Sequence, residues 1–256
     1  MGVEKMKSVL SAMAVSAALL ASLPAWAASL TIDGTTGTWT NPVTTSGPTG
    51  PLAGTGGSTI SWGVPALGTK LQSSYGYANT GSVTQTSAGS FLIGQFTHTN
   101  GTIWASSTQL HTADLNVSVS GTADGQAFSL SSSFAFSHDE TLNEASTCAG
   151  GGPRPCGDTV GISLLTGAPL VITQGNTIFT IVIDGFVQSL GGSVISAFLT
   201  PELAKTPLYL QASLSMTTLP PPPPPPPASV PVPPAGMALV AALGALGALR
   251  ARRHRR

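Results

Sequence analysis

Apolar and polar residues alternate along much of the chain between residues 28 and 219. In residues 113–122, every second position from Ala113 to Val119 is apolar, which places one face of a strand in a core. No stretch of this region carries a sustained apolar stripe with the 3.6-residue period of an amphipathic helix. The pattern therefore predicts an all-β fold.

A second regular run follows directly. Its apolar residues on one face are Phe128, Leu130, Phe134 and Phe136. Asp124-Gly125 lies between the two runs and supplies the positive-φ residues that a tight hairpin needs. We expect the two strands to pair.

Further strands are expected in four other segments, at residues 58–64, 91–97, 177–183 and 208–216. Several short strands separated by Gly-rich turns favour a single β-sandwich domain, jelly-roll-like, over residues 28–219. A barrel would give much the same sequence pattern, so this alternative stays open.

The N-terminus has the organisation of an export signal. Lys5 and Lys7 precede an apolar stretch at residues 9–23, and Ala25-Trp26-Ala27 supplies the small residues that signal peptidase recognises. Residues 1–27 are therefore predicted to be a signal peptide, cleaved between Ala27 and Ala28. An uncleaved anchor is the alternative, but this apolar run is short and polar sequence follows it.

The C-terminal segment begins with eight consecutive prolines at residues 220–227. Residues 220–229 are predicted to form an extended polyproline stalk. The remaining residues, 230–256, combine a proline-containing motif, an apolar stretch and five arginines. This tail is predicted to be a transmembrane helix, with its arginines on the cytoplasmic side of the membrane.

The formal net charge of zero conceals an acidic body. Between residues 28 and 219 there are three basic and nine acidic residues, a net charge of minus six. Nucleic-acid binding depends on clustered Lys and Arg side chains that neutralise phosphates. The composition therefore argues against a nucleic-acid partner.

The tail resembles the PEP-CTERM sorting signals of Gram-negative bacteria. Its motif consists of Val230, Pro231, Val232, Pro233, Pro234, Ala235 and Gly236, and it is similar to the variant Val-Pro-x-Pro-Ala-Gly with one extra proline. The resemblance implies recognition by an exosortase-like enzyme at the inner membrane, and a final location at the cell surface or outside the cell.

The body also resembles the THxN family of PEP-CTERM proteins. Phe96-Thr97-His98-Thr99-Asn100 matches the family signature, and further matches are Ser61-Trp62-Gly63, Gln72-Ser73-Ser74-Tyr75, His138-Asp139-Glu140-Thr141 and Pro155-Cys156-Gly157-Asp158. The resemblance implies a protein of the envelope or extracellular matrix, in a family with no established activity.

Cys148 and Cys156 are the only cysteines, and they lie in a Gly- and Pro-rich segment of a chain predicted to reach an oxidising compartment. A disulfide is expected. The alternative is a zinc site, because His138-Asp139-Glu140 followed by Pro155-Cys156 faintly resembles the motifs of zinc deaminases. The second cysteine of that motif is absent, since Asp158 and Thr159 follow Cys156.

Candidate metal ligands gather at the predicted strand ends. They are His98, His138, Asp139, Glu140 and Asp158. By alternation His138 and Glu140 project to one side of their strand and Asp139 to the other. Calcium or another divalent ion is one hypothesis, and a hydrogen-bonded polar loop is the other.

No pattern typical of an enzyme is present. The chain lacks the Gly-x-Ser-x-Gly and His-Glu-x-x-His motifs, so a non-catalytic role is expected, with a secreted hydrolase as the remote alternative. A structural or adhesive role in the envelope or exopolysaccharide is predicted. The rival is a divalent-ion-dependent carbohydrate-binding module. Five aromatic residues form either a sugar-stacking platform for such a module or part of the core, namely Trp39, Trp62, Trp104, Tyr75 and Tyr77.

Overall fold

The computed structural model describes residues 28–45, 50, 52–66, 68–143, 147–148, 150–151, 154–221, 223 and 234–253. The predicted signal peptide with Ala27, most of the proline stalk and residues 230–233 of the sorting motif lie outside them. The chain divides into two compact units, Met1–Leu219 and Pro220–Arg256.

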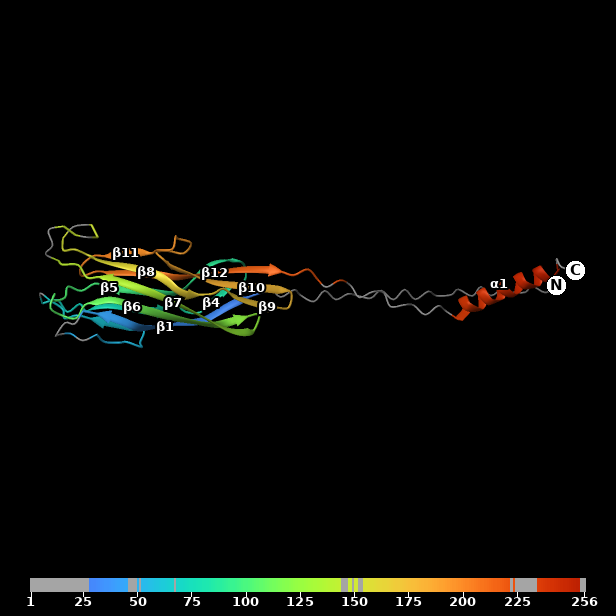
Figure 1. Cartoon of the computed structure of the whole chain (residues 1–256), viewed down its shortest axis with the longest axis horizontal. Coiled ribbons are helices and arrows are strands. Elements are labelled where there is room, and N and C mark those ends of the chain that lie inside the picture. Colours follow the sequence, from blue (N-terminus) through green and yellow to red (C-terminus); the bar gives the residue numbers. More distant parts are fainter. Residues whose placement is uncertain are drawn as a thin grey trace, which may run out of the picture. The chain divides into compact units, whose positions relative to one another are not determined.

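The described part of the first unit is built from strands, in two antiparallel sheets (Figure 1). One sheet contains β1 (Leu30–Thr44), β4 (Val83–Gln85), β6 (Leu110–Ala123), β7 (Gln126–Asp139), β8 (Asp158–Gly167) and β11 (Ala197–Thr200), in the order β11-β8-β7-β6-β1-β4. The other contains β2 (Thr59–Trp62), β3 (Ser73–Asn79), β5 (Gly89–Thr99), β9 (Leu170–Gln174), β10 (Thr177–Val187) and β12 (Lys205–Thr218), in the order β2-β3-β5-β12-β10-β9. The prediction of an all-β fold is confirmed.

The predicted hairpin is also confirmed. β6 and β7 pair in continuous antiparallel register, and the pair nearest the turn joins Ala123 to Gln126. Asp124 and Gly125 close this turn with φ values of 46° and 82°. Both residues therefore adopt the left-handed conformation that a two-residue hairpin turn requires.

The longest strand, β1, was not expected from the sequence. Leu30, Ile32 and Trp39 are buried on its inner face. Threonines and glycines occupy most positions between them, so that the apolar alternation is interrupted. β-branched threonine nevertheless favours the extended backbone, and β1 pairs with β6 along most of its length.

Side chains from both sheets meet in one hydrophobic core. Phe96 of β5 contacts Phe136 of β7 with ring centroids 4.8 Å apart, and it lies edge-on to Trp39 of β1 at 6.0 Å. Burying one such side chain contributes about 1.5–3 kcal/mol. Contacts between aromatic rings of the two sheets therefore supply much of the cohesion between them.

Tyr77 on β3 is packed against two glycines. A Cβ atom on Gly94 would lie 2.0 Å from the Tyr77 hydroxyl oxygen, and one on Gly37 would lie 2.4 Å from a ring carbon. The hydroxyl group donates a hydrogen bond of 3.0 Å to Thr35 Oγ1. Burial raises the pKa of Tyr77 to about 12, because the phenolate would lose its hydration.

The second unit contains one helix among its described residues, α1 (Pro234–Arg253), with Arg250, Arg252 and Arg253 in its last turn. Within the described part of the chain, no helix is long and apolar enough to cross a membrane. The predicted transmembrane helix is therefore not found among these residues. The apolar residues 235–249 give only 15 positions before the arginines, against the 20 or so that a bilayer core requires.

Candidate metal centre

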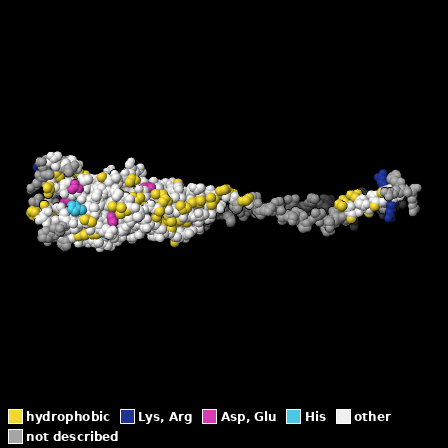
Figure 2. Space-filling view, viewed as in Figure 1, with side chains coloured by type: hydrophobic (Ala, Val, Ile, Leu, Met, Phe, Trp, Pro, Cys, Tyr) yellow, Lys and Arg dark blue, Asp and Glu magenta, His cyan; other side chains and the backbone are white. Residues whose placement is uncertain are grey.

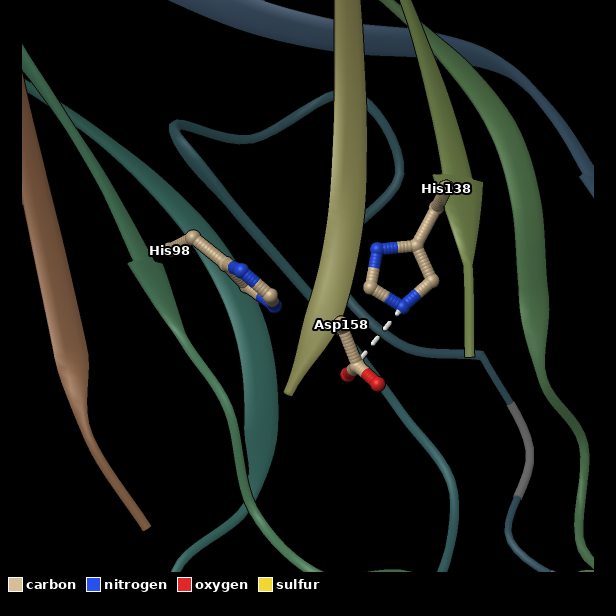
Figure 3. A group of neighbouring side chains, drawn as sticks. All are labelled: His98, His138 and Asp158. Atoms are coloured by element: carbon tan, nitrogen blue, oxygen red, sulfur yellow. Dashed lines mark ion pairs between the residues drawn. The ribbon is translucent and has the colours of Figure 1, made fainter. Parts of the chain in front are cut away.

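Three buried side chains from three strands converge between the two sheets (Figure 3). His98 comes from β5 in one sheet, and His138 and Asp158 come from β7 and β8 in the other. One ligand atom of each residue lies within 4.8 Å of the other two. His98 and Asp158 are fully buried, and His138 is 5% exposed.

Strand periodicity accounts for their convergence. His98 follows the core residue Phe96 on the inner face of β5. His138 pairs with Val160 of β8, and Asp158 lies two residues before Val160 on the same buried face. The two sheets therefore each direct polar side chains into the space where their aromatic core ends.

Each histidine uses its Nδ1 atom for a hydrogen bond away from the centre. His138 Nδ1 lies 2.7 Å from the Tyr75 hydroxyl, and His98 Nδ1 lies 2.9 Å from Thr200 Oγ1. Such partners fix the orientation of an imidazole ring, as they do for histidines that bind metals. The two Nε2 atoms remain for the centre.

Two side-chain polar atoms of these three residues have no hydrogen-bond partner among the described residues. They are His98 Nε2 and Asp158 Oδ2, and both are buried. Asp158 Oδ2 lies 3.6 Å from His138 Nε2, which is too long for a hydrogen bond. The other oxygen, Oδ1, accepts a hydrogen bond of 3.0 Å from the Thr141 backbone amide. That contact fixes the carboxyl group with Oδ2 toward the histidines.

Two more carboxyl groups border the centre. Glu140, Asp158 and Glu202 form a second group whose ligand atoms lie within 4.8 Å of one another. Glu140 Oε2 lies 3.4 Å from His138 Nε2 and accepts a hydrogen bond of 3.3 Å from the Trp62 indole. Asp139 is exposed on the opposite face of β7 and lies outside both groups.

Burial dominates the electrostatics of the centre. Loss of hydration lowers the pKa of His138 to about 4 and that of His98 well below its ordinary value. Burial raises the pKa of Asp158 and of Glu140, and their mutual repulsion raises that of Asp158 further. Within the described residues, the ion-pair partner near these carboxyl groups is His138, whose Nε2 lies 3.4 Å from Glu140 and 3.6 Å from Asp158, and its lowered pKa leaves the imidazole neutral near pH 7. The centre therefore gathers carboxyl groups with little compensating positive charge.

The predicted disulfide is confirmed and lies next to the centre. Cys148 and Cys156 are joined with an S–S distance of 2.07 Å. Thr141, whose amide binds Asp158, also donates a hydrogen bond of 3.1 Å from Oγ1 to the Cys156 carbonyl oxygen. Because both sulfur atoms are in the disulfide, they are not available as zinc ligands.

A cleft of about 440 Å³ opens beside the centre. Glu140 lines it, together with Trp104, Leu142, Asn143 and Gln109. Trp104 is 53% exposed. The Glu140 carboxyl group thus lies between the cleft and the buried histidines.

The structure separates the five aromatic residues considered as a sugar-stacking platform. Trp39, Trp62, Tyr75 and Tyr77 are buried in the core, and only Trp104 is exposed. Tyr75 and Trp62 instead form the walls of the centre, with the His138 ring 5.6 and 5.0 Å from their ring centroids. The platform hypothesis is wrong for four of its five members, because their side chains lie on inward faces of strands.

Sequence reasoning missed Thr200 and Glu202. Thr200 ends a short strand, β11, that no alternation indicated, and Glu202 follows it. Each is about 100 residues away from its partner, His98 for Thr200 and Thr102 for Glu202. Thr200 pairs with Asp158, the first residue of β8, and this pairing brings Thr200 and Glu202 to the centre. No local sequence signal would have identified them.

Comparison of the chain with models of known protein families and with curated proteins finds no match.

Proposed function

We propose that this chain is an exported structural or adhesive protein of the cell surface or extracellular matrix of a Gram-negative bacterium. The observation that carries the proposal is the disulfide between Cys148 and Cys156. Disulfides persist in oxidising compartments outside the cytoplasm, which agrees with the export signal expected at the N-terminus.

A non-enzymatic role is supported by the burial of the chemically capable groups. His98 and Asp158 are fully buried, so that a substrate would not reach them in this conformation. The face of the first unit seen in Figure 2 carries few charged side chains. A surface with few charges suits a protein embedded in hydrated polysaccharide.

The two facing sheets with a shared aromatic core favour a β-sandwich, jelly-roll-like, as the architecture of the exported module. Signal peptidase would release this module at Ala28. An exosortase-like enzyme at the inner membrane would then recognise the tail, beginning with the motif at residues 230–236. The arginine-rich end of α1 is consistent with such a sorting signal.

The deciding experiment is the intact mass of the protein recovered from the envelope and the medium of its native host, without reducing agent. A start at Ala28, loss of the tail beyond residues 230–236 and a mass two hydrogens below that of the reduced chain are expected. The same sample after reduction is the control for the disulfide. A retained N-terminus with free thiols would contradict export.

A divalent-ion-dependent carbohydrate-binding module is the second candidate function. The observation that favours it is the exposed Trp104 at the cleft, since an exposed aromatic ring can stack on a sugar. Under this proposal Trp104→Ala abolishes retention on the host's exopolysaccharide. Leu142→Ala is the matched control, because Leu142 is an exposed apolar residue of the same cleft. Equal loss in both variants, or in neither, would contradict a stacking role for Trp104.

A further inference from the structure

We propose that His98, His138 and Asp158 bind one zinc-class transition-metal ion, with Glu140 as the fourth ligand, and that this ion joins the two sheets. The first observation is the orientation of the donor atoms. Both histidines use Nδ1 for hydrogen bonds to Tyr75 and Thr200 and leave Nε2 toward Asp158. This is the arrangement in which a ligand histidine is fixed by a partner on its other ring nitrogen.

The second observation is the set of unpartnered atoms. Within the described residues, His98 Nε2 and Asp158 Oδ2 are buried and make no hydrogen bond. A buried polar atom without a partner costs about 1–3 kcal/mol. A cation between them would give both atoms a partner.

The distances suit an ion of this size. Two ligands of a tetrahedral zinc ion lie roughly 3.4 Å apart. His138 Nε2 lies 3.6 Å from Asp158 Oδ2 and 3.4 Å from Glu140 Oε2. The ligand atom of His98 is within 4.8 Å of those of His138 and Asp158, and Glu140 lies within the same distance of Asp158, so side-chain shifts of about 1 Å or more would bring the four ligands together.

The donor types favour zinc over calcium. Calcium takes six to eight oxygen ligands, whereas imidazole nitrogen suits zinc and the neighbouring transition metals. Two imidazoles and two carboxylates satisfy four-coordinate zinc without an open position, which is the property of a structural site. Glu140 is the one of the four ligands that lines the cleft, so an ion would enter from that side.

The position of the site defines its role. His98 belongs to the sheet that contains β5, and His138 and Asp158 belong to the sheet that contains β7 and β8. An ion bound by all three links the two sheets at the end where their aromatic core stops. Its loss would loosen that end, and the adjacent disulfide loop with it.

The test uses the full-length chain with its disulfide intact, treated with a chelator and then titrated with Zn²⁺ alone. One zinc per chain is expected by native mass spectrometry. With free zinc about 100-fold above Kd, Tm is expected to rise by roughly 5–10 °C. A folded chain that binds no zinc, or that gains as much in Tm from Ca²⁺, would overturn the proposal.

Matched histidine variants locate the site. His98→Gln is expected to abolish zinc binding and the rise in Tm. His111→Gln is the control, because His111 is an exposed histidine, and it is expected to bind zinc like the wild type. Equal zinc affinity in His98→Gln and the wild type would overturn the assignment.

A further variant decides the question if His98→Gln does not fold. Thr200→Val keeps every ligand and nearly the same volume but removes the hydrogen bond to His98 Nδ1. A loss of zinc affinity of about 10- to 100-fold is expected. Unchanged affinity would show that His98 is not held as a ligand, and the proposal would fail. None of these outcomes depends on export, so they are distinguishable from failure of the proposed function.

Discussion

Replacement of Tyr77 by Phe is expected to destabilise the protein near neutral pH and to stabilise it at high pH. At pH 8 the variant loses the hydrogen bond of 3.0 Å from the Tyr77 hydroxyl to Thr35. A buried hydrogen bond contributes about 1 kcal/mol to the free energy of unfolding. The variant should therefore be less stable than the wild type by about that amount.

The sign reverses because burial raises the pKa of Tyr77 from 10.0 to about 12. Above pH 10 the unfolded chain releases the phenolic proton while the folded chain still retains it, so the free energy of unfolding falls as the pH rises. At about 1.36 kcal/mol per pKa unit, the wild type loses roughly 1.9 kcal/mol by pH 11.5. Phe at this position does not titrate, and Tyr77→Phe should then be the more stable protein by about 0.9 kcal/mol.

Urea unfolding at a series of pH values measures the difference. The buried indoles of Trp39 and Trp62 report unfolding through their fluorescence. Thr35→Val is the control, because it removes the hydrogen-bond partner but keeps the titrating phenol and with it the loss of stability above pH 10. Parallel curves for wild type and Tyr77→Phe from pH 8 to pH 11.5 would refute the argument.

Three further changes test other parts of the fold by the same unfolding assay. Gly94→Ala should cost about 1–3 kcal/mol, because its Cβ would overlap a buried hydroxyl, whereas Gly76→Ala, whose Cβ has its nearest neighbour at 3.7 Å, should cost much less. Replacing Cys148 and Cys156 together by Ser should cost about 2.5 kcal/mol through the released loop, and an unchanged urea midpoint would contradict this. Phe96→Ala should cost about 3–5 kcal/mol, and a loss below 1 kcal/mol would contradict its place in the core.

The sequence contained enough information for the strands that alternate cleanly. β6 and β7 could be predicted with their turn, because apolar residues recur at every second position and Asp124-Gly125 marks the reversal. β1 could not, since its inner face includes Thr35, whose hydroxyl is buried and donates to the Ile93 carbonyl oxygen. In the sequence, a buried threonine cannot be distinguished from an exposed polar residue. The alternation of apolar and polar residues that would indicate β1 is therefore interrupted.

Strand alternation predicts only part of the metal centre. Period two correctly divides its candidates, because His138 is buried on the inner face of β7 and Asp139 is exposed on the outer face. It does not tell which strands become neighbours, and the neighbours decide the chemistry. Thr200 orients His98 only because β11 pairs with β8, a contact between residues far apart in the sequence. A list of candidate ligands follows from local pattern, whereas the orientation of each imidazole follows from the topology of the two sheets.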